Sequence, residues 1–243
     1  MPILFISDLH LEDKRPEITG LLTSFLRNTA RDAEALYILG DLFEFWIGDD
    51  FLSPTAKQVA GELKQLSESG VPVYFQHGNR DFLLGENYAE ESGMQLLPEQ
   101  LTVDLYGRPT LLLHGDSLCT DDVEYQAFRV QARNHAFQAM FLAQSVEKRL
   151  EMAASARDAS KQHTGNVDMA IMDVNETTVR EAFSQSGNHY MIHGHTHRPD
   201  VHEHKLEDGT KCERIVLADW YNSGSFLQVD EQGARSIALS LPV

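Results

Sequence analysis

Five apolar runs, each typical of a buried strand, are followed closely by side chains that bind metal ions. The runs cover residues 3–7, 35–39, 71–76, 110–113 and 189–192. Ligands in open α/β sheets bind beyond the carboxyl ends of the strands, so these five ends are expected to meet at one rim. Packing alone does not explain five such ends. We therefore predict a metal centre built from seven ligands: Asp8, His10, Asp41, Asn79, His114, His195 and His197.

The expected ligands are carboxylates, imidazoles and one amide, with no thiolate among them. This donor set suits Mn, Fe or Zn better than a soft metal. Seven ligands are too many for one tetrahedral ion, but they are enough for two ions that share a bridging carboxylate. A single histidine is more often structural than a ligand. We therefore expect structural roles for the others, which are His77, His135, His163, His189, His193, His202 and His204.

The length and the cysteine content indicate one α/β domain with an insertion, in a reducing compartment. A chain of 243 residues can bury a substantial core. Cys119 and Cys212 form neither a disulfide framework nor a zinc-knuckle spacing. The N-terminus lacks a basic signal region, and no stretch approaches the ~18 apolar residues that span a bilayer. We expect a cytoplasmic protein that reaches a membrane only at its surface.

The net charge of −17 argues against nonspecific binding to nucleic acid, which needs basic residues to neutralise phosphates. Residues 121–165, however, contain as many basic as acidic side chains, so the rest of the chain carries the whole charge. This segment is the part of the molecule that repels an anionic ligand or membrane least. Chance variation in surface charge is the alternative explanation.

Residues 121–157 carry apolar side chains at helical spacing. Such a stripe usually packs a helix against the core. This segment, however, is inserted between the loops of His114 and His195, so its helices are expected to cover the metal site as a cap. An apolar cap beside a hydrophilic metal centre suits an amphipathic substrate.

The motifs Asp8-Leu9-His10, Gly40-Asp41, Gly78-Asn79-Arg80, His114 and Gly194-His195-Thr196-His197 resemble, in this order, the calcineurin-like metallophosphoesterase superfamily. The resemblance implies a four-layer αββα sandwich in a single domain, 1–243, with a helical cap inserted at 121–168. It also implies that one metal is held by Asp8, His10, Asp41 and His197. Asp41, Asn79, His114 and His195 would hold the second, so Asp41 would bridge the two ions.

Arg80 stands where many members of the superfamily carry a histidine that helps to protonate the leaving oxygen. Arginine stays charged and cannot act as a general acid, but its planar fork can clamp a phosphate. Arg80 therefore suits a leaving group that needs no proton, such as a phosphate monoester with a last pKa of about 6. A pyrophosphate substrate fits this better than an alkyl phosphoester does. The alternative is a surface arginine beside a ligand.

Longer stretches, at 40–50, 78–85, 114–122 and 171–175, resemble the family of UDP-2,3-diacylglucosamine pyrophosphatases of lipid A biosynthesis nearly end to end. This resemblance implies an enzyme with two Mn²⁺, peripheral to the cytoplasmic face of the inner membrane. Water would attack the α-phosphorus of UDP-2,3-diacylglucosamine, giving UMP and 2,3-diacylglucosamine 1-phosphate. We expect a monomer that does not bind nucleic acid.

The same resemblance implies roles for individual residues. The catalytic set is Asp41, Asn79, Arg80 and His195. The substrate-binding set is Asn79, Arg80, Asp122, Ser160, Thr164, Asn166, Val167 and His195. At Val167 the chain departs from its relatives, since valine offers no side-chain hydrogen bond, and Asn166 is expected to take over. The candidates for an acyl-chain groove are Trp46, Leu83, Phe128, Phe137 and Phe141.

Two other functions remain open from the sequence. The first is a different metallophosphoesterase, such as a nucleotide pyrophosphatase, a protein phosphatase or a nuclease. A nuclease is disfavoured by the acidic surface, and a soluble nucleotide hydrolase has no need of an apolar cap. The second is a noncatalytic interaction module, which is disfavoured because all seven ligands are retained.

Overall fold

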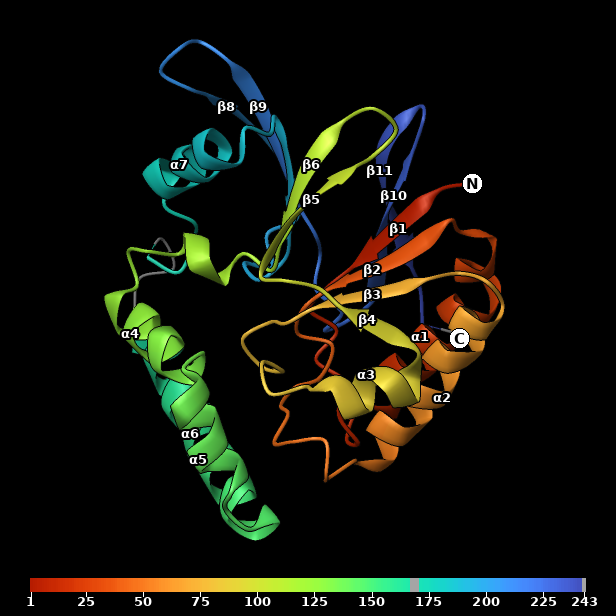
Figure 1. Ribbon diagram of the computed structural model, residues 1–243, viewed down its shortest axis with the longest axis vertical. Helices are drawn as coiled ribbons and strands as arrows, with labels where there is room; N and C mark the ends of the chain where they lie inside the picture. Colours follow the sequence, from red (N-terminus) through yellow and green to blue (C-terminus); the bar gives the residue numbers. More distant parts are fainter. Residues whose placement is uncertain (167–170, 242–243) are drawn as a thin grey trace.

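The computed structural model describes residues 1–166 and 171–241. The described residues form two facing β-sheets, with helices on the outer side of each sheet (Figure 1). The first sheet has the strand order β11-β10-β1-β2-β3-β4, and the second has the order β5-β6-β7-β9-β8.

The first sheet is mainly parallel. Its parallel strands are β1 (Ile3–Ile6), β2 (Ala35–Leu39), β3 (Val73–Gln76) and β4 (Met94–Leu96). At the other edge, β10 (Gly224–Asp230) runs antiparallel to β1, and β11 (Gly233–Leu239) runs antiparallel to β10. The outer face of the first sheet is covered by α1 (Pro16–Asn28), α2 (Pro54–Glu68) and α3 (Glu86–Ser92) (Figure 1). Ser53 and Pro54 begin α2, since the Ser53 hydroxyl oxygen accepts a hydrogen bond of 3.1 Å from the backbone N–H of Ala56 and Pro54 occupies the first turn.

The second sheet has a parallel centre and antiparallel edges. Its strands are β5 (Gln100–Asp104), β6 (Pro109–Leu113), β7 (Tyr190–His193), β8 (Val201–Lys205) and β9 (Lys211–Val216). β6, β7 and β9 run parallel, whereas β5 and β8 run antiparallel to their neighbours. Its outer face is covered by α7 (Glu176–Ser186).

Alternating side chains along the strands create separate apolar layers, as the two-residue repeat of a strand requires. In β1, Leu4 and Ile6 join the core under α1 and α2, while Ile3 and Phe5 join the core between the sheets. Phe183 of α7 packs with residues of the second sheet in a third cluster. Helices, sheet, sheet and helix therefore form the four layers, which confirms the expected αββα sandwich.

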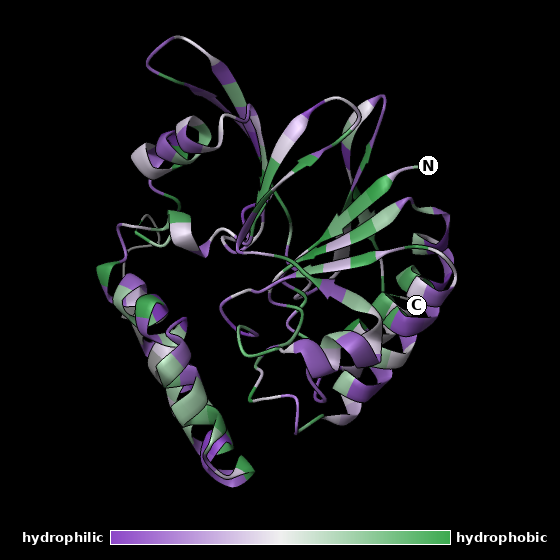
Figure 2. Ribbon diagram, in the orientation of Figure 1, coloured by the Kyte–Doolittle hydropathy of each residue, from purple (hydrophilic) through white to green (hydrophobic). Residues whose placement is uncertain are grey.

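Helices α4 (Val123–Ala132), α5 (His135–Leu142) and α6 (Val146–Asn166) project from the sandwich beside the ends of β1–β3 (Figure 1). Figure 2 shows hydrophobic and hydrophilic segments side by side on these helices. The five apolar runs of the sequence form β1, β2, β3, β6 and β7, whereas α3, β4, β5, α7 and the short 3-10 turns at Ala30–Asp32 and Asp116–Leu118 were not predicted. Among the described residues, no helix is both long and apolar enough to span a bilayer.

Candidate metal centre and adjoining cavity

The loops after β1 and β2 carry three of the predicted ligands and are bonded to each other. The backbone N–H of Asp8 donates to the carbonyl of Gly40 over 3.1 Å, and that of His10 donates to the carbonyl of Asp41 over 3.0 Å. The side chains of Asp8, His10 and Asp41 are at most 2% exposed. Carboxylates buried this deeply need compensating positive charge, so the loops create a place for cations.

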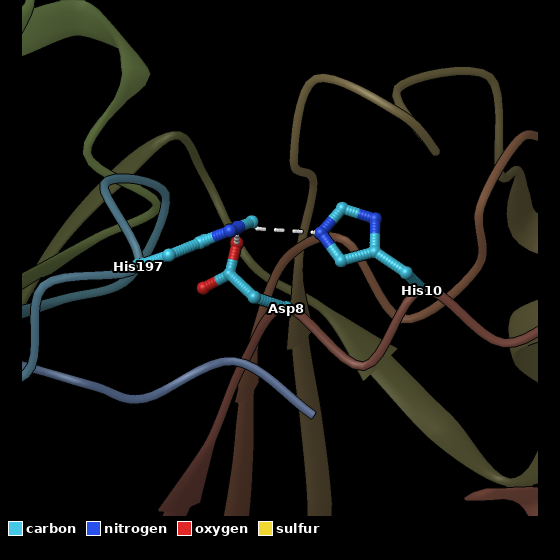
Figure 3. A group of neighbouring side chains, drawn as sticks. All are labelled: Asp8, His10 and His197. Carbon is cyan, nitrogen blue, oxygen red and sulfur yellow. Dashed lines mark hydrogen bonds and ion pairs between the residues drawn. The ribbon is translucent and has the colours of Figure 1, made fainter. Parts of the chain in front are cut away.

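Asp8, His10 and His197 form the first group of ligands, with their side chains pointing toward one another (Figure 3). Nε2 of His10 lies 3.3 Å from Nε2 of His197, which lies 3.2 Å from Oδ1 of Asp8. Nε2 of His10 is also 3.8 Å from Oδ2 of Asp41. Two imidazole nitrogens and two carboxylates therefore converge on one point.

The second group surrounds the other oxygen of Asp41. Nε2 of His114 lies 3.7 Å from Oδ1 of Asp41 and 3.0 Å from Oδ1 of Asn79. Nδ1 of His195 lies 2.9 Å from the same Asn79 oxygen. The structure thus brings all seven predicted ligands together, with one oxygen of Asp41 toward each group. The donor set of carboxylate, imidazole and amide fits divalent metal ions.

The backbone is strained at most of these ligands. Asp8, His10, Asp41, His195 and His197 all have φ between 49° and 67°, in the left-handed region. Non-glycine residues rarely adopt this conformation, and each instance costs of order 1–3 kcal/mol. Such strain persists where the surroundings fix it and clusters at functional sites, which fits a preorganised centre.

Two glycines allow the loops to approach the carboxylates closely. A Cβ at Gly78 would lie 2.1 Å from Oδ1 of Asp41, and a Cβ at Gly194 would lie 2.1 Å from Oδ2 of Asp8. Real Cβ contacts are never so short, so any side chain here would displace a ligand. The glycines of Gly78-Asn79 and Gly194-His195 are therefore required by the geometry of the site.

Asp81 holds the Asp41 loop and the Asn79 loop together. Its buried carboxylate accepts hydrogen bonds from the backbone N–H groups of Gly78 at 2.9 Å and Leu42 at 2.7 Å. Burial and the nearby charge of Asp41 raise the pKa of Asp81 to about 6. Asp81 was not among the predicted site residues, although it stands only two residues after Asn79.

The protonation states of Asp8 and His195 favour metal binding. Burial alone would raise the pKa of Asp8, but the hydrogen bond with His197 and the charge of His114 hold it well below its usual range. Burial and the charge of His114 lower the pKa of His195 to about 4. Near pH 7, Asp8 is therefore an anion and His195 is neutral, which are the forms that bind metal.

A cavity of about 450 Å³ lies between the ligand loops and the helices α4–α6, and Asn79 and Arg80 form part of its wall. Nε of Arg80 is buried and has no hydrogen-bond partner within the described residues. The cavity wall also includes all five acyl-groove candidates: Trp46, Leu83, Phe128, Phe137 and Phe141. Phe45, Phe82 and Met152 also line this wall but were not among the predicted groove residues, although Phe45 and Phe82 lie close to the motifs and Met152 lies in α6.

The remaining candidate substrate-binding residues lie on or near helices α4–α6, where the cap is expected. Oδ1 of Asp122 accepts a hydrogen bond of 2.9 Å from the backbone N–H of Tyr125, so Asp122 caps α4. Ser160 of α6 lines the cavity. Thr164 and Asn166 belong to α6, but their side chains are not described, and Val167 lies outside the described residues.

Comparison with known proteins agrees with this geometry. The family model of the calcineurin-like phosphoesterases matches residues 1–199. A "UDP-2,3-diacylglucosamine hydrolase" of Stenotrophomonas maltophilia is 54% identical over 96% of this chain and 96% of its own. A protein of the same name from Serratia proteamaculans is 51% identical over 98% of both chains. Another, from Xanthomonas axonopodis, is 50% identical over 99% of this chain and 100% of its own. The chain therefore belongs to the calcineurin-like phosphoesterases, and within them to the family of these UDP-2,3-diacylglucosamine hydrolases.

Proposed function

We propose that this chain hydrolyses the pyrophosphate bond of UDP-2,3-diacylglucosamine in lipid A biosynthesis, giving UMP and 2,3-diacylglucosamine 1-phosphate. The observation that carries the proposal is the apolar cavity that meets the cluster of seven ligands at Asn79 and has the neighbouring Arg80 in its wall. Acyl chains need such a cavity, whereas a soluble nucleotide does not. The names of the relatives support the same substrate.

The proposed cofactor is a pair of Mn²⁺ ions. Asp8, His10, Asp41 and His197 would hold one ion, and Asp41, Asn79, His114 and His195 would hold the other. When bound, two such ions would supply Lewis acidity at the pyrophosphate and would acidify a nearby water. The contact of each Asp41 oxygen with a different ligand group supports this division.

Asp41, Asn79, Arg80 and His195 form the proposed catalytic set. The backbone N–H of Arg80 donates to Oδ1 of Asp41 over 2.8 Å, so Arg80 is attached to the bridging carboxylate. Its guanidinium would clamp the pyrophosphate and stabilise charge during water attack on the α-phosphorus. The departing sugar phosphate needs no proton, so a residue that cannot act as an acid suffices here.

The proposed sugar and phosphate contacts are Asp122, Ser160, Thr164, Asn166 and Val167, together with Asn79, Arg80 and His195. The acyl chains would lie among Trp46, Leu83, Phe128, Phe137 and Phe141. Ser160 and these five apolar residues line one cavity with Arg80, which supports a single amphipathic ligand that reaches from the ligand cluster into the cap.

We also propose that the protein is a monomer peripheral to the cytoplasmic face of the inner membrane. Val123 and Val130 of α4 are 73% and 71% exposed, and Met140 of α5 is exposed as well. Apolar side chains on an interfacial helix bind a membrane through buried apolar area. Flotation with vesicles of anionic phospholipid would detect this binding, and protein that stays unbound at every salt concentration would contradict it.

The decisive experiment is hydrolysis of UDP-2,3-diacylglucosamine with Mn²⁺ in water enriched in heavy oxygen. UDP-N-acetylglucosamine is the matched control, because it carries only an acetyl group at position 2 and a free hydroxyl at position 3. Label in UMP, together with an inert control, is the expected result. Label in the sugar phosphate would contradict attack at the α-phosphorus, and equal turnover of both nucleotides would favour a different metallophosphoesterase.

A further inference from the structure

Glu44 lies between a predicted metal ligand and the cap. Oε2 of Glu44 is 2.9 Å from Nδ1 of His10, and Oε1 contacts Nη2 of Arg157 on α6. We propose that Glu44 is a positioning residue for His10, and that Arg157 makes metal binding at the first position depend on the docking of α6. The inference rests on the two-metal site of the proposed function.

Glu44 determines which nitrogen of His10 is available to a metal. An ionised carboxylate only accepts hydrogen bonds, so the nitrogen beside it, Nδ1, carries the proton. Nδ1 of His10 and Oε2 of Glu44 are both buried, and neither has a partner of full hydrogen-bond geometry among the described residues. The 2.9 Å between them is an ion-pair distance, so each faces the other as its charge partner. The lone pair of Nε2 then faces His197 and Asp41, toward the centre of the first ligand group. Carboxylates beside metal-binding imidazoles fix this tautomer and increase the basicity of the ring.

The plane of the His10 ring is fixed from another side. The ring of Tyr221 is stacked on it, with centroids 5.1 Å apart and an angle of 8° between the planes. Stacking restricts tilting of the ring but does not distinguish Nδ1 from Nε2. Glu44 supplies that distinction, so the two neighbours together orient the ligand.

His114, a predicted ligand of the second group, has a partner in the core instead. Nδ1 of His114 contacts the carbonyl oxygen of Leu39 at 2.8 Å, and Leu39 belongs to the buried strand β2. A backbone carbonyl in the core keeps its place whether or not the cap is docked. The partner of His10, by contrast, is a side chain that also binds the cap.

Helix α6 is attached to the loop after β2 at a second point. Nη1 of Arg149 donates to the carbonyl of Ile47 over 2.6 Å and to Oδ1 of Asp50 over 2.7 Å. Arg149 and Arg157 therefore connect one helix to the segment that contains Glu44. Because coupling between two sites is reciprocal, metal bound at His10 also favours the docked position of α6.

The test compares Mn²⁺ binding to the full chain and to its variants by calorimetry and by Mn²⁺ electron paramagnetic resonance. The Arg27–Glu62 pair provides matched controls, since it joins α1 to α2 away from the ligands and its carboxylate is 8% exposed, against 11% for Glu44. We expect Glu44→Ala to weaken one of two Mn²⁺ sites about 10- to 100-fold, as loss of such a partner does elsewhere. Arg157→Gln should weaken the same site about 5-fold, at the low end of coupling between sites. Glu62→Ala and Arg27→Gln should bind Mn²⁺ as the unaltered chain does.

Nitrogen NMR of the metal-free protein provides a readout that does not depend on activity. His10 should carry its proton on Nδ1, and Glu44→Ala should shift it toward a mixture of tautomers, while Glu44→Gln should keep most of the original form. Unchanged Mn²⁺ affinity and an unchanged tautomer in a folded Glu44→Ala protein would overturn the inference. An effect of Glu44→Ala without any effect of Arg157→Gln would overturn the link to the cap. If the unaltered chain bound no Mn²⁺, the proposed function itself would fail.

Discussion

The hydroxyl of Tyr125 donates a hydrogen bond of 2.9 Å to the buried carboxylate of Asp116, across the junction between the cap and the core. Nε of Arg129 donates to the same oxygen over 2.9 Å. Burial and repulsion by the charge of Arg133 lower the pKa of Arg129 to about 10. The carboxylate of Asp116 therefore compensates positive charge of Arg129 and Arg133, and Glu99 forms a second ion pair with Arg129.

Asp116→Asn should destabilise the protein by about 1.5–3 kcal/mol, the usual range for a hydrogen bond to a charged group. The amide keeps the shape of the side chain but no longer compensates the charges of Arg129 and Arg133. Urea denaturation measures the change. Asp230→Asn removes an acidic partner from the exposed Arg235 pair and should leave the midpoint nearly unchanged. Equal midpoints for the two variants would contradict the role of Asp116.

Gly78→Ala should abolish hydrolysis and weaken metal binding. The new methyl group would collide with Oδ1 and with the backbone nitrogen of Asp41, so the bridging carboxylate must move. Gly61→Ala is the matched control, because nothing lies within 4 Å of a Cβ at this position of α2. Alanine there should stabilise the helix by about 0.5–1 kcal/mol and leave activity unchanged. Parallel assays of turnover and Mn²⁺ affinity distinguish the two substitutions.

The ligand cluster could be predicted because its residues lie in short motifs that follow apolar runs in the sequence. Asp41 and His114 each follow an apolar run, and the parallel strands β2 and β6 deliver them to one rim. The αββα layers were implied by the family resemblance. The left-handed backbone of His10 could not be predicted, since it results from bonds to a loop 31 residues away.

The supporting residues were missed because their partners are distant in sequence. Glu44 acts on His10 and on Arg157, and only the folded chain brings these three together. Helix α7 was missed because most of its surface is polar, and only Val179 and Phe183 are buried in the third core cluster. A short amphipathic stretch of this kind gives a weak periodic signal.

Arg80→Lys should reduce turnover by at least 10-fold while the fold is retained. Lysine keeps the positive charge but loses the planar fork that can bind two phosphate oxygens. Arg80 borders the cavity beside Asn79, so this fork is placed to meet the pyrophosphate. Steady-state kinetics with Mn²⁺ measures the loss, and Arg31→Lys on the exposed surface is the control. Near-normal turnover of Arg80→Lys would remove it from the catalytic set.

Ala153→Leu should shift the substrate preference toward shorter acyl chains. Ala153 of α6 lines the cavity, so the larger side chain occupies volume that the acyl chains need. Its neighbour Ala154 is exposed and is not part of the cavity wall, which makes Ala154→Leu the matched control. The measurement is kcat/KM for substrates that differ only in acyl length. An unchanged preference in Ala153→Leu would place the acyl chains elsewhere.

The stability of the metal-free protein should fall as the pH falls below about 6.5, in part because of His193. This imidazole is fully buried, with Nδ1 2.8 Å from the carbonyl of Gly194 and Nε2 3.0 Å from Nη1 of Arg214. Burial and the charge of Arg214 lower the pKa of His193 to about 3. Between pH 6.5 and 3 the unfolded chain therefore holds a proton at this site that the folded chain does not, and acid favours unfolding.

Through His193, the free energy of unfolding should fall by about 1.4 kcal/mol for each pH unit below 6.5, which is the value for uptake of one proton on unfolding. Urea denaturation at pH 7.5, 6.5 and 5.5, with chelator present, measures the dependence. His193→Gln preserves an acceptor for Arg214 but removes the titrating ring. Unfolding of this variant should take up about one proton fewer, so its free energy of unfolding should depend less on pH. An identical pH dependence in the two proteins would show that His193 already takes up a proton in the folded state, against the geometry of its two neighbours.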